Sequence, residues 1–236
     1  MVGSKQPQPV FLSVEEADKH CQSGASIWKF CSTDDGLDPD VVLVGIGSEL
    51  MFEVVVAAAI LRRKCPDLRV RVVNVTDLMI LEAETLHPHA LSNDEFSSLF
   101  TPDRPIHFNY HGYANEIKGL LFGRHNLDRV SIECYKEEGS TTTPFDMMLR
   151  NNVSRYDVVE AAIKGAAKHN KKIELDMTTL LGEVRHQVTK AHQYIMETGK
   201  DPEGSFDIPK FEGTVFGKDA GKSGDNSSKE DGFFVN

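Results

Sequence analysis

The chain has 236 residues and carries 26 Lys and Arg against 36 Asp and Glu, which gives a formal charge of -10 at pH 7. Hydrophobic residues make up 40% of the sequence and charged residues 26%, so the composition excludes a collagenous or wholly disordered chain. Because an acidic surface repels polyanions, we expect no binding to nucleic acid or to anionic membranes.

Four scattered cysteines form no CxxC pair, so neither a zinc knuckle nor a dithiol redox motif of that kind is present. The first ten residues lack the basic start and apolar run of a secretory signal. The longest apolar stretch, residues 54–61, is shorter than the roughly 20 residues that cross a bilayer. We therefore expect a reduced, cytoplasmic protein.

Residues 1–12 are predicted to form an extended arm, because two prolines in this stretch disfavour helix. A capping box at residues 13–16 then begins a short helix that ends near Gly24. Residues 27–30 alternate between apolar and polar, which predicts a short strand.

Four apolar runs predict further strands, at residues 41–46, 70–75, 106–110 and 130–135. Helical patterns separate them: one begins at Ser48, one begins at the capping box of residues 92–95, and one ends at Gly123. Strands that alternate with helices predict an α/β fold: a three-layer, Rossmann-like, mostly parallel sheet with helices on both faces.

Helices alone follow the fourth strand. Thr143 before a proline and Ser154 are predicted to cap two of them, and a third stops at Gly199. Residues 212–236 consist largely of glycine, serine and charged residues, so we expect a disordered tail. The folded domain is therefore predicted to span residues 13–211.

The turn at residues 45–50 follows a strand and opens a helix, as a dinucleotide-binding turn does. Leu50 stands where the third glycine would be, and Asp77 lies too far along the chain for a ribose-binding acid. A tight turn is favoured, although a weak anion site at this helix start stays open.

Three other patterns are weaker. The glycine-rich stretch at residues 217–223 has neither the spacing nor the preceding strand of a phosphate loop. The pair His87 and His89, and the pair Glu183 and His186, each lack a third metal ligand. We favour a solvated tail and surface or capping histidines.

Polar aromatic residues follow the third long strand, where open α/β sheets build their sites. His111 and Tyr113 lie at this strand-to-helix turn, and His111 could bind an anion, move a proton or satisfy backbone groups. The hydroxyls of Ser140, Thr141 and Thr142 precede a capped helix and could hold an anion or form the turn itself.

Several of these motifs together resemble the carboxyl-terminal domain of D-xylulose 5-phosphate/D-fructose 6-phosphate phosphoketolase, in the transketolase superfamily. They are the run Lys136-Glu-Glu-Gly-Ser-Thr-Thr-Thr-Pro-Phe-Asp-Met147 and residues 108–113, 72–78, 3–7 and 12–17. The resemblance extends over about residues 1–211. It implies an aldehyde-lyase of carbohydrate and pentose phosphate metabolism that forms acetyl phosphate and an aldose phosphate from a ketose phosphate and phosphate.

The resemblance also implies that thiamine diphosphate and Mg²⁺ are held by two preceding domains, so no cofactor, metal or catalytic residue is expected in this chain. Residues 1–12 correspond to the end of the preceding domain, and Lys5 matches a lysine that contacts substrate or inorganic phosphate. His111, Tyr113, Ser140, Thr141 and Thr142 are expected to flank that site.

The main hypothesis is a phosphoketolase carboxyl-terminal domain that packs against the amino-terminal and middle domains, contributes to the dimer, forms one wall of the phosphate entrance and is inactive alone. An apolar patch left by those domains predicts self-association. One alternative is a regulatory module that binds an anion or nucleotide at the helix starts near Gly47 and Thr143. A weaker alternative is an independent dinucleotide-binding protein.

Overall fold

The computed structural model describes residues 8–136 and 141–211. Five strands form one sheet in the order β1-β3-β2-β4-β5. Four of them run parallel, and β1 pairs antiparallel with β3 at one edge. The strands are β1 (Ala25–Ile27), β2 (Val41–Ile46), β3 (Val70–Val75), β4 (Ile106–His111) and β5 (Val130–Tyr135).

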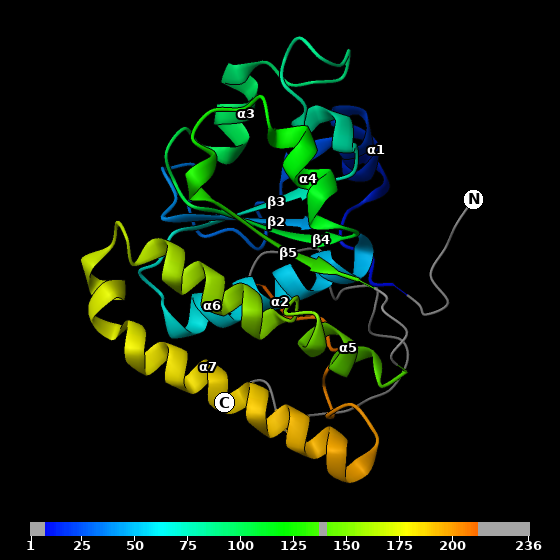
Figure 1. The fold of residues 1–236 in the computed structure, drawn as a ribbon, viewed down its shortest axis with the longest axis vertical. Helices are drawn as coiled ribbons and strands as arrows, with labels where there is room; N and C mark the ends of the chain where they lie inside the picture. The colour runs from blue at the N-terminus through cyan, green and yellow to red at the C-terminus, as the bar shows by residue number, and fades with distance from the viewer. Residues whose placement is uncertain (1–7, 137–140, 212–236) are drawn as a thin grey trace.

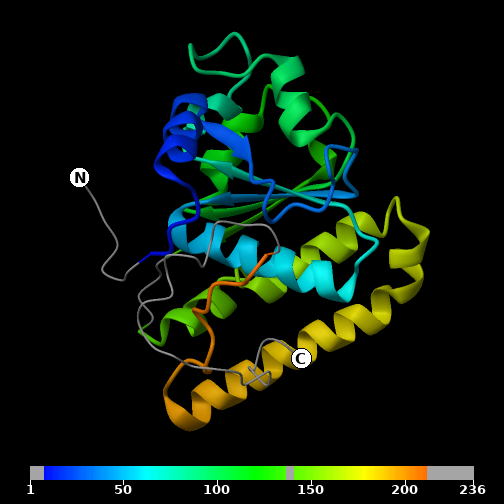
Figure 2. The same ribbon diagram turned by 180° about the vertical axis from the view of Figure 1, so that it is seen from behind.

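The helices cover both faces of this sheet (Figures 1 and 2). On one face lie α3 (Asn93–Phe100) and α4 (Ala114–Leu121), and on the other lie α2 (Ser48–Lys64) and α6 (Arg155–Ala166). The predicted three-layer α/β class is therefore confirmed, and the long helix α7 adds a further layer outside α6. The remaining elements are α1 (Val14–Ser23), η1 (Leu78–Leu81), η2 (Leu127–Arg129), α5 (Pro144–Arg150) and α7 (Lys171–Thr198).

Side-chain caps fix the helix starts that the sequence predicts. The Ser13 hydroxyl accepts a hydrogen bond from the Glu16 amide, and the Glu16 carboxylate accepts one from the Ser13 amide at 2.9 Å. Ser92 begins α3 in the same way, and the Thr143 hydroxyl caps α5. At the other end of the chain, Gly199 adopts a left-handed conformation and ends α7.

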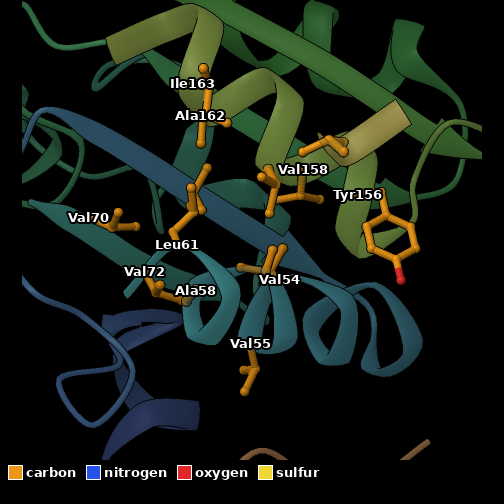
Figure 3. Packing of buried hydrophobic residues seen from close by; sticks show 14 of the residues in the cluster. Val54, Val55, Ala58, Leu61, Val70, Val72, Tyr156, Val158, Ala162 and Ile163 are labelled. Carbon is orange, nitrogen blue, oxygen red and sulfur yellow. The ribbon is translucent and has the colours of Figure 1, made fainter. Parts of the chain in front are cut away.

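A large apolar core lies between the sheet and the α2 and α6 layer (Figure 3). Val54, Ala58 and Leu61 of α2 pack among side chains of β3 and α6. Leu43 on β2 belongs to the same core and is fully buried. A second core on the opposite face joins the sheet to α3, η1 and α4.

The short strand near the amino terminus is not where it was predicted. The alternation at residues 27–30 placed it too late, because the strand is Ala25–Ile27 and a turn begins after it. What defines this strand is pairing with residues 73–75 of β3, which lie far away in the sequence. A local pattern of apolar residues cannot predict that pairing.

A buried ion pair ties α2 to α6 and to the segment after α7. Both carboxylate oxygens of Glu53 accept hydrogen bonds from Arg155, from its backbone amide at 2.6 Å and from its guanidinium at 2.6 and 2.9 Å. The same guanidinium donates to the Ser205 carbonyl at 2.7 Å and lies over the Phe145 ring. Because both ionic side chains are almost fully buried, removing one partner would leave the other charge unpaired.

Among the helices in the described ranges, none is both long and apolar enough to span a membrane. The predicted tail at residues 212–236 and the first seven residues of the predicted arm lie outside those ranges, so both remain predictions. The rest of the arm, residues 8–12, contains neither helix nor strand.

Candidate functional site at the carboxyl edge of the sheet

The central strands β2 and β4 define a topological switch point. The chain leaves β2 through α2 toward β3, and it leaves β4 through α4 toward β5, on the opposite side of the strand pair. Figure 1 shows α2 and α4 on opposite faces of the sheet. In open α/β sheets a crevice forms where two connections diverge in this way, outside the carboxyl ends of the strands.

His111 closes β4 at this crevice, and the structure supplies a partner for it. The Glu49 carboxylate, in the first turn of α2, lies 3.4 Å from Nδ1 of His111. It also accepts a hydrogen bond from the Ser48 hydroxyl at 3.1 Å. Partial burial alone would raise the pKa of Glu49, but its own backbone amide, the Ser48 hydroxyl and His111 together hold that pKa below its usual value.

The backbone at the end of β2 makes room for this pair. Gly47 has a φ of 95°, and a Cβ atom there would lie 2.7 Å from Cβ of His111. Glycine is therefore required by both conformation and space. On its other side, the His111 ring meets the Tyr135 ring edge-on, with 4.9 Å between the ring centroids. Both groups are only partly buried, so the imidazole remains accessible at the sheet edge.

Tyr113 follows His111 by two residues, and no hydrogen bond joins their side chains among the described contacts. It precedes α4, its backbone amide donates to the Glu116 carboxylate at 3.3 Å, and its side chain is 58% exposed. Glu116 also accepts a hydrogen bond from Tyr110 at 2.5 Å.

The threonines before α5 serve the helix start. The Thr142 hydroxyl donates to the buried Asp146 carboxylate at 2.7 Å, and Arg150 donates to the same oxygen at 2.6 Å. The other oxygen of Asp146 lies 3.0 Å from Nδ1 of His192 on α7. Burial alone would raise the pKa of Asp146, but Arg150, Thr142 and His192 hold it below its usual value. Thr141, by contrast, is exposed.

Two of the residues predicted for the site, Lys5 and Ser140, lie outside the described residues. The sequence reasoning missed Glu49 and Tyr135, which meet His111 from α2 and β5. The available signal for Glu49 was its place just after a strand, combined with the rule that carboxyl ends of parallel strands share one edge.

The weaker histidine patterns form ordinary surface contacts. His89 lies 2.7 Å from the Asp77 carboxylate and packs edge-on against His87. Glu183 pairs with Lys64 at 3.0 Å. Across the described part of the chain, no three His, Cys, Asp or Glu side chains are placed to hold a metal ion.

The family of the chain follows from comparison with known proteins. The model of the XFP C-terminal domain matches residues 5–210. The chain belongs to the phosphoketolase C-terminal domain family. The motifs that resemble phosphoketolase lie almost entirely inside this matched range, including residues 136–147 and the His111 turn.

Curated phosphoketolase relatives extend over most of the chain. A protein of Schizosaccharomyces pombe named "Probable phosphoketolase" is 52% identical over 211 residues, which are 89% of this chain and 25% of the relative. A protein of the same name from Gloeobacter violaceus is 40% identical over 207 residues, which are 85% of this chain and 25% of that protein. The chain thus spans about a quarter of the length of these phosphoketolases.

Solved structures similar to this phosphoketolase domain include transketolases. A transketolase from Leishmania mexicana matches with a TM-score of 0.42 and 18% identity, over 64% of this chain and 19% of that one. A chain titled "Split gene transketolase, inactive beta4 tetramer" matches with a TM-score of 0.41 and 15% identity, over 61% of this chain and 42% of that one.

Proposed function

We propose that the chain is the accessory carboxyl-terminal lobe of a thiamine-diphosphate-dependent phosphoketolase and is inactive alone. The parent enzyme would cleave a ketose phosphate with inorganic phosphate into acetyl phosphate and an aldose phosphate. The observation that carries this proposal is the match to the Schizosaccharomyces pombe relative, which covers 89% of this chain but a quarter of that protein. The other three quarters are then the natural place for the reacting centre.

The ligands that thiamine diphosphate and Mg²⁺ require can be compared with the described residues. Binding a diphosphate through Mg²⁺ requires several converging oxygen ligands. The described residues provide no three-residue acidic or histidine cluster of that kind. We therefore propose that the cofactor is held by other domains.

We propose that the carboxyl edge of the sheet forms one wall of the phosphate entrance. His111, with Glu49 beside it, presents a partly exposed imidazole whose ring N–H can donate a hydrogen bond to phosphate. Tyr113 adds an exposed hydroxyl just after β4, and Thr141 adds another before α5. Lys5, as a point charge for phosphate, and Ser140 complete the proposed wall.

The surface supports packing against partner domains. Val10 and Val14, at the start of the described chain, expose 78% and 88% of their surface, and Phe206 and Ile208, after α7, expose 55% and 39%. These four side chains give the two ends of the described chain apolar surface that a neighbouring domain can bury. We propose that the amino-terminal and middle domains cover them, and that the free chain self-associates instead. Light scattering that found a monomer at every concentration would contradict self-association.

We propose a cytoplasmic location. The four cysteines are all free, and three of them are buried, as suits a protein in a reducing compartment. Cell fractionation that recovered the protein from an oxidising compartment would contradict this assignment.

The proposed function can be tested with one chimera. The purified chain, given fructose 6-phosphate, phosphate, thiamine diphosphate and Mg²⁺, should form no acetyl phosphate. When it replaces the matching quarter of the Schizosaccharomyces pombe relative, activity should return. Within the chimera, His111→Ala should raise the KM for phosphate by about tenfold, a loss typical of one removed hydrogen bond to a charged group, whereas His125→Ala on an exposed turn should not.

Two results would contradict the proposal. Turnover by the isolated chain would overturn its inactivity. A folded chimera without turnover would overturn its role as the matching lobe. The regulatory alternative has little support, because carboxylates already occupy the first turns of both α2 and α5. Calorimetry with adenine nucleotides should accordingly show no binding to the chain.

A further inference from the structure

The segment that follows α7, residues 200–211, forms a strap that runs back toward α2 (Figure 2). It contains neither helix nor strand, and contacts along its length attach it to the rest of the domain. The Asp201 carboxylate accepts a hydrogen bond from the Phe145 amide at 3.2 Å, and the Ser205 carbonyl accepts one from Arg155 at 2.7 Å. Phe211, at the end of the strap, is 7% exposed and provides a further attachment.

Phe211 belongs to a cluster of aromatic rings between α2 and the turn that follows β1. The Arg62 guanidinium of α2 lies 5.1 Å from the centroid of the Phe211 ring. Arg62 is itself held by a hydrogen bond that it donates to the Ser32 carbonyl at 2.8 Å. The Phe30 ring meets the Phe211 ring edge-on, with 5.7 Å between the centroids. The end of the strap is therefore fixed by one cation and one aromatic ring.

The amino-terminal segment, residues 8–12, enters the same cluster through Phe11. The Phe11 ring lies 5.2 Å from the Trp28 ring and is stacked on the Phe30 ring at 6.3 Å between centroids. Trp28 and Phe30 also contact each other, with 5.5 Å between their centroids. Phe30 thus contacts the rings of Phe11 and Phe211, so one side chain joins two segments that are about 200 residues apart in the sequence.

Side chains rather than backbone ladders hold these two segments. Within the described ranges, residues 8–12 and 208–211 make no hydrogen bond between backbone groups. Trp28, by contrast, is fixed to the sheet, because its amide donates to the Val72 carbonyl at 2.9 Å. Segments with few backbone hydrogen bonds open locally at low free energy. The ring contacts therefore decide whether Phe11 and Phe211 stay docked.

We propose that the strap and the amino-terminal segment dock and release together, with Phe30 as the link between them. Release of Phe211 removes one of the rings that hold Phe30 in place, so the stacked contact between Phe30 and Phe11 weakens. A coupling between two docking equilibria is reciprocal, so release of Phe11 weakens the docking of Phe211 by the same factor.

This coupling goes beyond the proposed function and does not depend on it. Under that function, residues 8–12 lead in from the preceding domain. The strap then fixes the direction from which that domain approaches the sheet. The end of the lobe that lies farthest along the chain would in this way control how the lobe joins its neighbour.

The first test uses the emission of Trp28, which is the only tryptophan of the chain. Its side chain is 6% exposed, and its Nε1 has no hydrogen-bond partner among the described residues. In the whole chain, Phe211→Ala should release Phe11 and admit water to the indole. The emission should shift to longer wavelength, and acrylamide should quench it more strongly. The matched control is Phe206→Ala, on the same strap at a ring that is 55% exposed, and it should change neither signal.

The second test measures release from both ends with chymotrypsin, which cleaves after an aromatic ring only when that ring leaves its contacts. Phe211→Ala should speed cleavage after Phe11 by about threefold to tenfold, the loss of one aromatic pair. Phe11→Ala should speed cleavage after Phe211 by the same factor. Cleavage after Phe108, which is fully buried in β4, should stay slow in both variants and so report that the fold is retained.

Three outcomes would overturn the proposal. If Phe211→Ala changed neither the Trp28 emission nor the cleavage after Phe11, the two segments would dock independently. If Phe206→Ala had the same effect as Phe211→Ala, general loosening of the strap would explain the result without the ring contact. If only one of the two variants affected the opposite end, or if cleavage after Phe108 rose in step, the change would reflect damage to the fold rather than coupling.

Discussion

The two halves of the sheet face the same helical layer with opposite chemistry. Toward α2 and α6, strands β2 and β3 present Val41, Leu43, Val70 and Val72, all fully or almost fully buried in the apolar core. Toward the same layer, β4 and β5 present His107, Asn109, His111, Ser131, Glu133 and Tyr135. The change occurs between neighbouring strands, where Leu43 lies in register with His107.

This contrast separates stability from binding. Burying apolar side chains stabilises the fold, whereas burying polar ones without partners costs free energy. The β2 and β3 half therefore holds the domain together. The β4 and β5 half gives up some stability for polar groups. At the carboxyl ends of the strands these groups face the His111 crevice, and nearer the amino ends they face a groove under α6 that is lined by His107, Ser131 and Glu133.

The largest effect is expected in the apolar half. Leu43→Ala removes a fully buried side chain from the core beside α2, so it should lower the free energy of unfolding by about 3 kcal/mol, measured by urea denaturation. Leu37→Ala, at a side chain that is 60% exposed, is the matched control and should cost less than about 0.5 kcal/mol. A loss below about 1 kcal/mol for Leu43→Ala would contradict the assignment of this half as the main source of stability.

An intermediate effect is expected from Asp157 in the polar half. Its pKa is about 6 in the folded chain against an ordinary value of 3.8, so between these values the folded state binds more protons than the unfolded state. Stability should therefore fall as pH rises from about 4 to about 6, by on the order of 1 to 2 kcal/mol after allowance for partial exposure.

Urea denaturation across this pH range, with Asp157→Asn as the reference, measures the effect. Glu133 and His107 also have shifted pKa values, and the lowered pKa of His107 acts with the opposite sign, but both residues are present in the two proteins. The difference between the proteins therefore isolates Asp157. If the free energy of unfolding of the native chain, minus that of Asp157→Asn, stays constant or rises between pH 4 and 6, the charge of Asp157 is not destabilising.

The smallest effect is expected where the two halves meet. His107→Leu extends the chemistry of Leu43 onto the next strand and removes a buried nitrogen without a partner, so stability should change by less than about 1 kcal/mol at pH 7 or rise slightly. Because the pKa of His107 is lowered to about 4, the unfolded state binds more protons than the folded state between pH 6.5 and 4. The native protein therefore loses stability as pH falls over that range. The gain from His107→Leu should grow over that range in thermal unfolding. A loss above about 2 kcal/mol at pH 7 would mean that the imidazole is satisfied after all.

Much of the fold was predictable because its signals are local. The runs at residues 41–46, 70–75 and 130–135 match β2, β3 and β5 residue for residue. The caps at Ser13 and Thr143 mark helix starts through hydrogen bonds that reach only three residues along the chain. The carboxyl-terminal phosphoketolase family was predictable because a long specific motif is contiguous.

The candidate site was less predictable because it depends on strand order. His111 could be placed at a strand end, but its contact with Glu49 exists only because β4 lies beside β2. Its contact with Tyr135 requires β5 on the other side. The polar side chains on β4 and β5 were hidden for the same reason, since the strand pattern around His107 shows alternation without showing which helix covers it.

The ion pair between Arg155 and Glu53 has a consequence for proteolysis. Its guanidinium also donates to the Ser205 carbonyl, and the Phe145 amide donates to Asp201 at 3.2 Å, so residues 201–205 supply acceptors to the interior. A protease that cut just after Gly199 would therefore separate the Ser205 carbonyl from a buried cation and the Asp201 carboxylate from the Phe145 amide. A fragment ending there should be degraded far faster than its intact helices would suggest.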